Sequence, residues 1–477
     1  MRARLLAPEN RKWWTLAAVT FGLFMIMLDN TVVNVALPAM QDDLGISQAG
    51  LEWVVNAYAL TFGVLLLSGG KLADLLGRRK IFIVGLVIFT AASLACGLAT
   101  GPGILIAART VQGVGAALMN PATLSIITAT FPARQRGMAI GIWAGVSAMA
   151  LAIGPLVGGI LTQKISWSWI FFINVPIGVA GVLAARLFID ESRDTSHEQR
   201  LDVPGLLVSS AGLFAITYAL ISTNHHAWTS TLVLSMFAVG AVALAVFALL
   251  ELRQRLPMLD LALFRNATFA GANTVMLLTG VAMFGIFFYN SLLFQRIIGY
   301  SAIQTGAIFL PMTVLIMLVA PAAGKFSDRL GSRWLMAVGM LLLTGSLLEF
   351  AQLDRGSNFW DILPALLLGG VGMALVMTPT TAAAMGSVPV DKAGVGSAVI
   401  NSMRQVGGSL GIAVMGAVVA TQVSVKPGDP RFPDQFVAGY HHASYTCAGI
   451  TFGAAFLAAA FVRKVRHPEP APELAHA

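Results

Sequence analysis

Long apolar segments, each followed by a short polar stretch, run through almost the whole of this 477-residue chain. A helix needs about 20 mostly apolar residues to cross the hydrocarbon core of a bilayer, and about fourteen segments meet that condition. These segments cover residues 13–38, 49–70, 80–100, 103–130, 135–163, 168–188, 203–223, 230–252, 268–294, 302–323, 335–353, 358–386, 394–422 and 437–462. Only 11% of the residues are charged, whereas a soluble domain carries about 25%. The sequence therefore predicts an all-α, polytopic membrane protein.

The cationic residues lie mainly between the apolar segments. If the N-terminus is cytoplasmic, 23 of the 30 lysines and arginines fall on the cytoplasmic side, five on the outer side, and Arg109 and Arg404 within spans. Cytoplasmic loops of membrane proteins carry such an excess of positive charge. We therefore expect an even number of spans, both termini in the cytoplasm, and a multi-pass location in the cell membrane. No basic face with base-stacking residues accompanies the net charge of +8, so we expect no nucleic-acid partner.

The chain contains an internal repeat. GKLADLLGRRK at 70–80 returns as GKFSDRLGSRW at 324–334, and GVGAALMNPAT at 113–123 returns as GVGMALVMTPT at 370–380. Many transporters are built from two repeats with the binding site between them. We expect a six-helix bundle over 13–188, a linker with two inserted transmembrane helices over 189–267, a second six-helix bundle over 268–462, and a cytoplasmic tail over 463–477.

The repeated 70–80 element is a candidate for gating. Its glycines permit a tight turn, and Asp74 beside Arg78 can form a charge network where helix ends leave unsatisfied groups. The alternative is an ordinary basic loop without a gating role. Because the element recurs in the second half of the chain, this alternative is less favoured. The candidate gating residues are Gly70, Lys71, Asp74, Gly77, Arg78, Arg79, Gly324, Asp328, Arg329, Gly331 and Arg333.

Asp29 is an acidic residue within the first apolar segment. An acid at membrane depth costs about 2.5–3.5 kcal/mol on insertion scales, so it usually faces an aqueous cavity or a partner. Such a carboxyl can hold a proton or face a cationic drug, or it can simply pair with a neighbouring helix. Arg109 lies at a depth that could approach Asp29, or it could extend to the outer surface. Burial favours a protonated carboxyl and a nearby arginine favours an ionised one, so the sequence leaves the balance open.

Other polar or aromatic residues within spans are candidates for a substrate cavity. The set is Asn34, Trp143, Tyr289, Asn290, Asn401, Arg404 and Gln405. For each of them, helix packing or hydrogen bonding between helices is the alternative. A further candidate is a kink at Gly154, Pro155, Gly158 and Gly159. Proline removes a helix hydrogen bond and glycine lets another helix approach closely, although span packing alone explains the same residues.

These motifs together resemble the major facilitator superfamily. The 70–79 loop is similar to its loop signature, and LDNTVVNVALP at 28–38 is similar to the first-span motif of its fourteen-span drug:proton antiporters. Further similar stretches are RTVQGVGAA at 109–117, GPLVGG at 154–159, WIFFINVPIG at 169–178 and PMLDLALFRN at 257–266. Leu75 stands where the family usually has arginine, and Met149 interrupts the upstream glycines of the fifth-span motif.

The resemblance implies a major facilitator fold with fourteen transmembrane helices that moves by alternating access. It implies proton-coupled antiport that exports hydrophobic, cationic or zwitterionic drugs, with multidrug efflux and antibiotic resistance as consequences. It also implies that Arg109 and Gln112 take part in proton coupling with Asp29, and that the 154–159 kink contributes to the motion. An exporter of one metabolite, lipid or antibiotic shares every motif. A nutrient uniporter or symporter does not need GPLVGG, and a receptor does not need Asp29.

We expect no enzyme activity and no cofactor, with protons as the coupling ion. The pairs His225-His226 and His441-His442 lack metal-ligand spacing, since adjacent side chains on a helix point different ways, so no metal site is expected. Both cysteines, Cys96 and Cys447, lie in apolar segments and are expected to be free thiols. The expected partners are a small-molecule substrate and the lipid bilayer, and we expect a monomer, with an accessory envelope partner left open.

Overall fold

The computed structural model describes residues 8–46, 48–193, 202–222, 226–254, 259, 261–425 and 429–463, and the predicted tail beyond 463 lies outside them. Within these residues the chain is helical and forms no strand. The helices are α2 (Pro8–Leu44), α3 (Gln48–Leu76), α4 (Arg78–Gly97), α5 (Pro102–Thr130), α6 (Ala133–Lys164), α7 (Trp169–Phe172), α8 (Asn174–Phe188), α9 (Val203–Ser222), α10 (Thr231–Arg253), η1 (Leu261–Arg265), α11 (Ala267–Leu292), η2 (Leu293–Ile298), α12 (Ala302–Ile308), α13 (Leu310–Leu330), α14 (Ser332–Phe350), α15 (Phe359–Gly386), η3 (Val390–Lys392), α16 (Ala393–Ala420) and α17 (Phe432–Phe461).

The helical content follows from the apolar composition. Lipid offers no hydrogen-bond partner, so the backbone of a span must satisfy its own polar groups within a helix. Thirteen helical stretches of the described residues are long and apolar enough to cross a membrane. The 32-residue α6 is not among the thirteen. The prediction of a multi-span, all-α membrane protein is confirmed, and the count of fourteen stays a prediction.

Some predicted segments are interrupted or extended. The segment predicted over 168–188 consists of α7 and α8, which a turn at Ile173 separates. The segment predicted over 302–323 consists of α12 and α13, with a break at Phe309. The last turns of the 268–294 segment widen into η2, which ends at Gly299 with a positive φ of 90°. Apolar composition predicts a span but does not predict these local changes of helix type.

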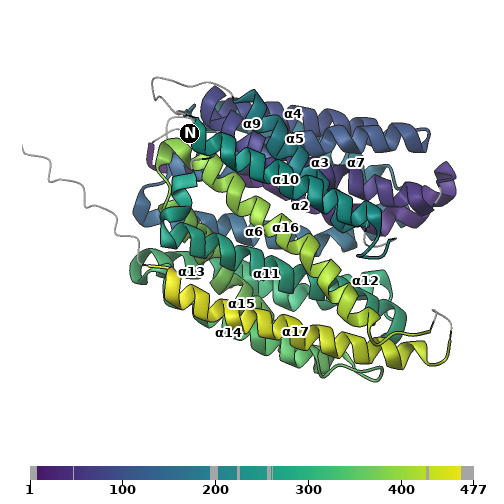
Figure 1. Cartoon of the computed structure of the whole chain (residues 1–477). Helices are drawn as coiled ribbons and strands as arrows, with labels where there is room; N and C mark the ends of the chain where they lie inside the picture. The colour runs from purple at the N-terminus through teal and green to yellow at the C-terminus, as the bar shows by residue number, and fades with distance from the viewer. Residues whose placement is uncertain are drawn as a thin grey trace, which may run out of the picture.

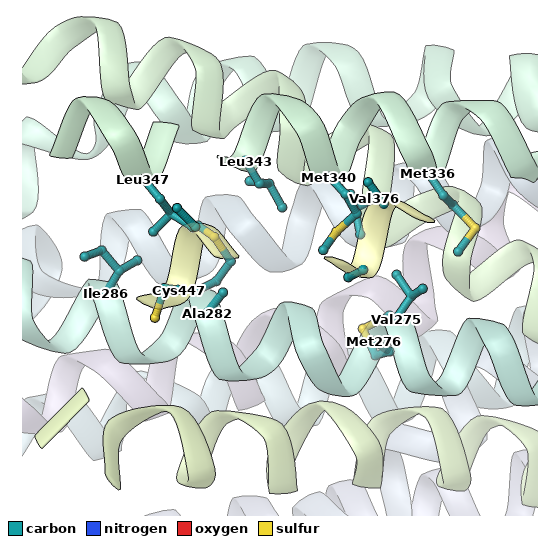
Figure 2. Close-up of a cluster of buried hydrophobic side chains, with 14 of the residues drawn as sticks. Val275, Met276, Ala282, Ile286, Met336, Met340, Leu343, Leu347, Val376 and Cys447 are labelled. Carbon is teal, nitrogen blue, oxygen red and sulfur yellow. The ribbon is translucent and has the colours of Figure 1, made fainter. Parts of the chain in front are cut away.

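The helices form two groups with separate hydrophobic cores (Figure 1). Residues of α2 to α8 build two neighbouring clusters, and residues of α11 to α17 build almost all of a third. Figure 2 shows part of the third cluster, where Met340 and Leu343 of α14 lie opposite Met276 and Ala282 of α11. In Figure 1, α6 and α16 lie between the two groups, and each packs along a helix of the opposite group, α13 and α3 respectively.

The internal repeat appears as a repeated helix contact. An added Cβ at Gly85 of α4 would lie 2.7 Å from the carbonyl oxygen of Gly115 of α5. The equivalent Gly339 of α14 would lie 3.0 Å from the carbonyl oxygen of Gly372 of α15. Both pairs therefore bring two helix backbones into contact, which small residues permit. The predicted boundaries of the two bundles remain a prediction.

The inserted helices lie on one side of the two groups. α9 and α10 pack along each other, and α9 also contacts α3 and α16. Trp53 of α3 lies 6.5 Å, centroid to centroid, from Tyr218 of α9. Since α3 and α16 belong to opposite halves, the inserted pair covers one seam between the halves.

Candidate functional site

A buried polar cluster lies within the first half, on α2 and α5. An Nη atom of Arg109 lies 2.5 Å from an Oδ atom of Asp29, and the same guanidinium donates to Oε1 of Gln112 at 2.6 Å. The amide of Gln112 donates to the second carboxylate oxygen of Asp29 at 2.9 Å. Asp29 and Gln112 are 0% exposed and Arg109 is 2% exposed. Arg109 therefore turns inward to Asp29 and does not extend to the outer surface.

Neighbouring helices complete the surroundings of this cluster. The Nε–H of Arg109 donates to the backbone carbonyl of Val54 on α3 at 3.0 Å, and the guanidinium carbon lies 4.2 Å from the ring centroid of Tyr58. Gln112 also donates to the hydroxyl of Ser93 on α4 at 2.8 Å. Both charges are thus paired and hydrogen-bonded, which is what burial in low dielectric requires. Tyr58 and Ser93 were not predicted, because a single tyrosine or serine in an apolar span carries no signal of its own.

The glycines of the predicted kink pack α6 onto α2 close to Asp29. A Cβ at Gly154 would lie 1.8 Å from the Thr31 hydroxyl oxygen, and a Cβ at Gly158 would lie 2.8 Å from a methyl carbon of Val32. The next residue of α6, Gly159, faces Ile303 of α12, which belongs to the second half. The helix continues through these residues without a break, and the side chain of Pro155 lies outside the described set. These glycines therefore set the distance between α6 and the helix that carries Asp29.

Replacement of Gly154 by alanine is expected to destabilise the protein by about 1–3 kcal/mol, the usual cost of overpacking. The new methyl group would force α2 and α6 apart at Thr31. Gly145→Ala on the same helix is the matched control, since its Cβ would meet its nearest neighbour at 3.4 Å, an ordinary contact. Thermal unfolding of the two variants in detergent measures the difference. Equal melting temperatures would contradict the packing described here.

The repeated loops hold the two halves together at one end of the molecule, which we call the basic end and define by Lys71–Lys80 and Lys325–Arg333. Asp74 of α3 accepts hydrogen bonds from the backbone N–H groups of Gly394 and Val395, the first turn of α16, at 2.9 and 3.0 Å. Arg78 binds the same carboxylate at 2.9 Å and also donates to the carbonyl of Val390. An acidic group at a helix N-terminus meets unsatisfied N–H groups and the positive end of the helix dipole.

The second copy makes the reciprocal contact with fewer bonds. Asp328 of α13 accepts from the backbone N–H of Gly137, near the start of α6, at 3.0 Å. Its other carboxylate oxygen has no hydrogen-bond partner, and it forms no ion pair with an arginine of the described residues. Helices α3 and α13 cross α16 and α6 closely at Gly70 and Gly324. The two contacts are in equivalent places, and Asp328 has the charge of Arg136 nearby in place of an ion pair.

The remaining loop residues shape the turns. Gly77 and Gly331 occupy equivalent positions with φ of 108° and 89°, a region in which residues with side chains are strained. Glu191 accepts from the backbone N–H groups of Arg79 and Lys80 at 3.1 Å and so caps α4. Lys71 is half-buried, whereas Arg329 and Arg333 are exposed. The predicted network at Asp74 and Arg78 is present, and the gating role of all these residues stays a prediction.

The predicted cavity residues whose side chains the structure describes lie in several places. Trp143 is buried in the first half and donates its ring N–H to Thr123 at 2.9 Å. Asn290 accepts a hydrogen bond from Tyr440 of α17 at 2.5 Å, and Tyr289 stacks on Phe436 of α17.

In contrast, Arg404 donates to Asn401 at 3.0 Å, and its backbone lies against Gly280 of α11. Tyr289 is nine residues beyond Gly280, about 13 Å along the helix at 1.5 Å per residue. Gln405 is half-buried and faces Gly63 of α3. The side chain of Asn34 lies outside the described set.

The described residues contain no group of three or more His, Cys, Asp and Glu side chains able to hold a metal ion. Cys96 and Cys447 are buried free thiols. The buried cluster joins a carboxylate, a guanidinium and an amide from two helices by direct hydrogen bonds. Two repeated helical halves with reciprocal contacts at one end are an architecture that many membrane transporters have. The chain belongs to the Major Facilitator Superfamily, whose family model matches residues 19–412.

Relatives and solved structures agree with that assignment. The chain is 36% identical over 428 residues to the tetracenomycin C resistance and export protein of Streptomyces glaucescens, covering 90% of this chain and 79% of that one. It is 37% identical to the puromycin resistance protein of Streptomyces alboniger, with 86% of this chain and 82% of that protein covered. It is 36% identical to the multidrug resistance protein Stp of Mycobacterium tuberculosis, with 86% of this chain and 76% of that protein covered.

The fold also resembles the human organic anion transporter MFSD10, with a TM-score of 0.68, 14% identity, and 94% and 99% of the chains covered. The comparison with the proton:xylose symporter XylE gives a TM-score of 0.66 at 14% identity, with 96% of this chain and 97% of that chain covered. The relatives are antibiotic and multidrug resistance or export proteins, which supports a drug exporter.

Proposed function

We propose that this protein is a proton-coupled antiporter that exports hydrophobic, cationic or zwitterionic compounds from the cytoplasm by alternating access. The observation that carries the proposal is the fully buried cluster of Asp29, Arg109 and Gln112. Among the described residues the partners of this carboxylate are an arginine and an amide, so a change in its protonation changes those contacts. Proton binding and helix movement are therefore coupled at one place.

The cluster favours a specific exchange. In the paired state the carboxylate of Asp29 accepts from Arg109 and Gln112. A proton on Asp29 removes the negative charge that Arg109 binds and turns one acceptor oxygen into a donor. Arg109 then keeps its hydrogen bonds to the Val54 carbonyl and to Gln112, and its contact with the Tyr58 ring. Protonation from the outer side and deprotonation toward the cytoplasm would alternately weaken and restore the packing of α2 against α5.

The contacts at the basic end supply the other half of the cycle. We place this end at the cytoplasm, with both termini there, because most of the lysines and arginines then lie inside. Asp74 and Asp328 close that end by binding the first turns of α16 and α6. Substrate would enter from the cytoplasm when these contacts open. When one proton exchanges for a zwitterionic compound of zero net charge, one positive charge moves inward and releases about 2.3 kcal/mol across 100 mV. When one proton exchanges for a monovalent cation, no net charge moves and the pH difference alone drives export.

An exporter for a single compound is the second candidate function. Relatives are named for tetracenomycin C, puromycin, methylenomycin A and cephamycin, each a single antibiotic. The relative from Mycobacterium tuberculosis is named for multidrug resistance. Both functions use the same coupling site, so breadth of substrate is what separates them.

Efflux from cells that express the protein tests the proposal. We expect cells loaded with ethidium, rhodamine 123, puromycin or tetracenomycin C to lose at least one of these compounds faster than control cells. Addition of a proton uncoupler is expected to remove the difference, because the proton gradient drives the exchange. Loss of several compounds supports multidrug export, and loss of one supports the narrower function. Efflux that persists after the uncoupler, in cells still containing ATP, would contradict proton coupling.

A further inference from the structure

Three arginines are buried in the described part of the chain, and they differ in their partners. Arg78 pairs with Asp74 and Arg109 pairs with Asp29, in each case with nitrogen and oxygen 2.5 to 2.9 Å apart. Arg404 on α16 is 9% exposed, yet none of the described carboxylates forms an ion pair with it. It is therefore a cation at membrane depth whose charge no described acid compensates.

The hydrogen bonds of Arg404 are also incomplete. Guanidinium has five N–H donors. One Nη donates to the side-chain oxygen of Asn401 at 3.0 Å, whereas the buried Nε–H has no acceptor among the described residues. The buried hydroxyl of Ser397, seven residues earlier, also lacks a partner. Ser397, Asn401 and Arg404 lie at i, i+4 and i+7, which places them on one face of α16.

That face lies where the two halves meet. The next residue, Gln405, faces Gly63 of α3 in the first half. On the other side of Arg404, Gly407 packs against the backbone of Leu277 of α11 in the second half. The polar face therefore lies between the side of α16 that contacts the first half and the side that contacts α11. A compound bound between the halves would reach it.

A buried, unpaired charge is strongly unfavourable unless an opposite charge binds to it. The free donors of a guanidinium fit a carboxylate or another planar anion in a bidentate manner. We propose that Arg404 binds an anionic group, a carboxylate or a phenolate, of the compound that the protein exports. This inference rests on the proposed function and narrows it, since zwitterionic compounds are then preferred over purely cationic ones.

Two dyes that differ at one group test the assignment. Rhodamine 110 carries a carboxylate, and rhodamine 123 is its methyl ester, so both share the cationic ring system. We expect the purified full-length protein to bind rhodamine 110 about tenfold more tightly, the effect of one charge-assisted hydrogen-bonded pair. Fluorescence anisotropy titration measures both affinities, and export of both dyes is measured in proteoliposomes with a proton gradient.

Variants at Arg404 separate recognition from folding. Arg404→Gln is expected to abolish the preference for rhodamine 110 and to leave rhodamine 123 binding within about twofold, because only the carboxylate loses its partner. Arg404→Lys keeps the charge and is expected to keep part of the preference, which provides the test if the glutamine variant does not fold. Arg296→Gln, which removes a positive charge at an exposed position of η2, is the matched control and should leave the preference unchanged.

Each contrary result has a separate meaning. A preference that survives Arg404→Gln, or an equal loss of affinity for both dyes, would overturn the assignment. If rhodamine 123 binding to the wild type depends on chloride, as shown by exchange for methanesulfonate, the site holds a free anion and the assignment to the substrate is wrong. Absence of proton-driven export of every compound tested contradicts the proposed function itself. If both rhodamines are exported and bind with equal affinity, only the role of Arg404 is contradicted.

Discussion

Replacement of Asp29 by asparagine is expected to reduce proton-driven export to the background of protein-free vesicles. Asparagine has nearly the same shape but cannot exchange a proton, so the coupling step has no carrier. It also leaves the Arg109 charge uncompensated at 2% exposure. Breaking a buried ion pair by removal of one partner costs about 3–5 kcal/mol, so a lower melting temperature should accompany the loss of export.

A double variant separates the two effects. Asp29→Asn with Arg109→Gln removes both charges, and we expect it to recover much of the lost stability, because no unpaired charge remains. Export should remain absent. Asp42→Asn, at an exposed position of the same helix, is the matched control and should export as the wild type does. Recovery of proton-driven export in the double variant would contradict the coupling role of Asp29.

Replacement of Asp74 by asparagine is expected to open the basic end of the molecule. Asp74 binds two N–H groups of α16 and the guanidinium of Arg78. Hydrogen bonds to charged groups contribute about 1.5–3 kcal/mol each. A net loss of about 3 kcal/mol changes the balance between closed and open forms about 100-fold. We expect export to fall at least about tenfold, since the closed form becomes too rare to complete the cycle.

Labelling of a buried cysteine measures this opening. Ser397→Cys places a thiol of similar size at a 0% exposed position, close to the α16 turn that Asp74 binds. A membrane-impermeant maleimide on the cytoplasmic side should label this thiol slowly in the wild type and much faster with Asp74→Asn. Asp328→Asn is the comparison and should have a smaller effect, because Asp328 uses one oxygen and forms no described ion pair. Equal labelling rates in all three proteins would contradict the closing role of Asp74.

The sequence predicted the helical fold and identified the residues of the main polar pairs for physical reasons. Apolar length predicts spans, and an acid and an arginine at similar depth made a pair one of two alternatives. Recurrence of the GKLAD element predicted equivalent loops, which the positive φ of Gly77 and Gly331 confirms. The sequence left open whether Arg109 points toward Asp29 or toward the outer surface. The three-dimensional packing shows that it points inward, to Asp29.

Other features could not be predicted, because they depend on contacts between distant segments. Nothing near Asp74 in the chain indicates that its partner is the start of α16, 320 residues away. Nothing in the sequence of the α16 polar cluster indicates that, among the described residues, Arg404 has no carboxylate partner whereas Arg78 and Arg109 each have one. The residues grouped as one cavity in the sequence lie in separate places, since Tyr289 and Asn290 pack toward α17. The position of a residue along a span predicts whether its side chain is buried. It does not predict which neighbouring helix the side chain contacts.

The most direct test of proton coupling at Asp29 is proton release on substrate binding. Purified protein in weakly buffered detergent solution is mixed with a compound that it exports, and the pH is followed with an indicator dye. Proton coupling at Asp29 predicts that the wild type releases protons upon binding and that Asp29→Asn, still binding the compound, releases none. Equal proton release by the wild type and by Asp29→Asn would contradict it.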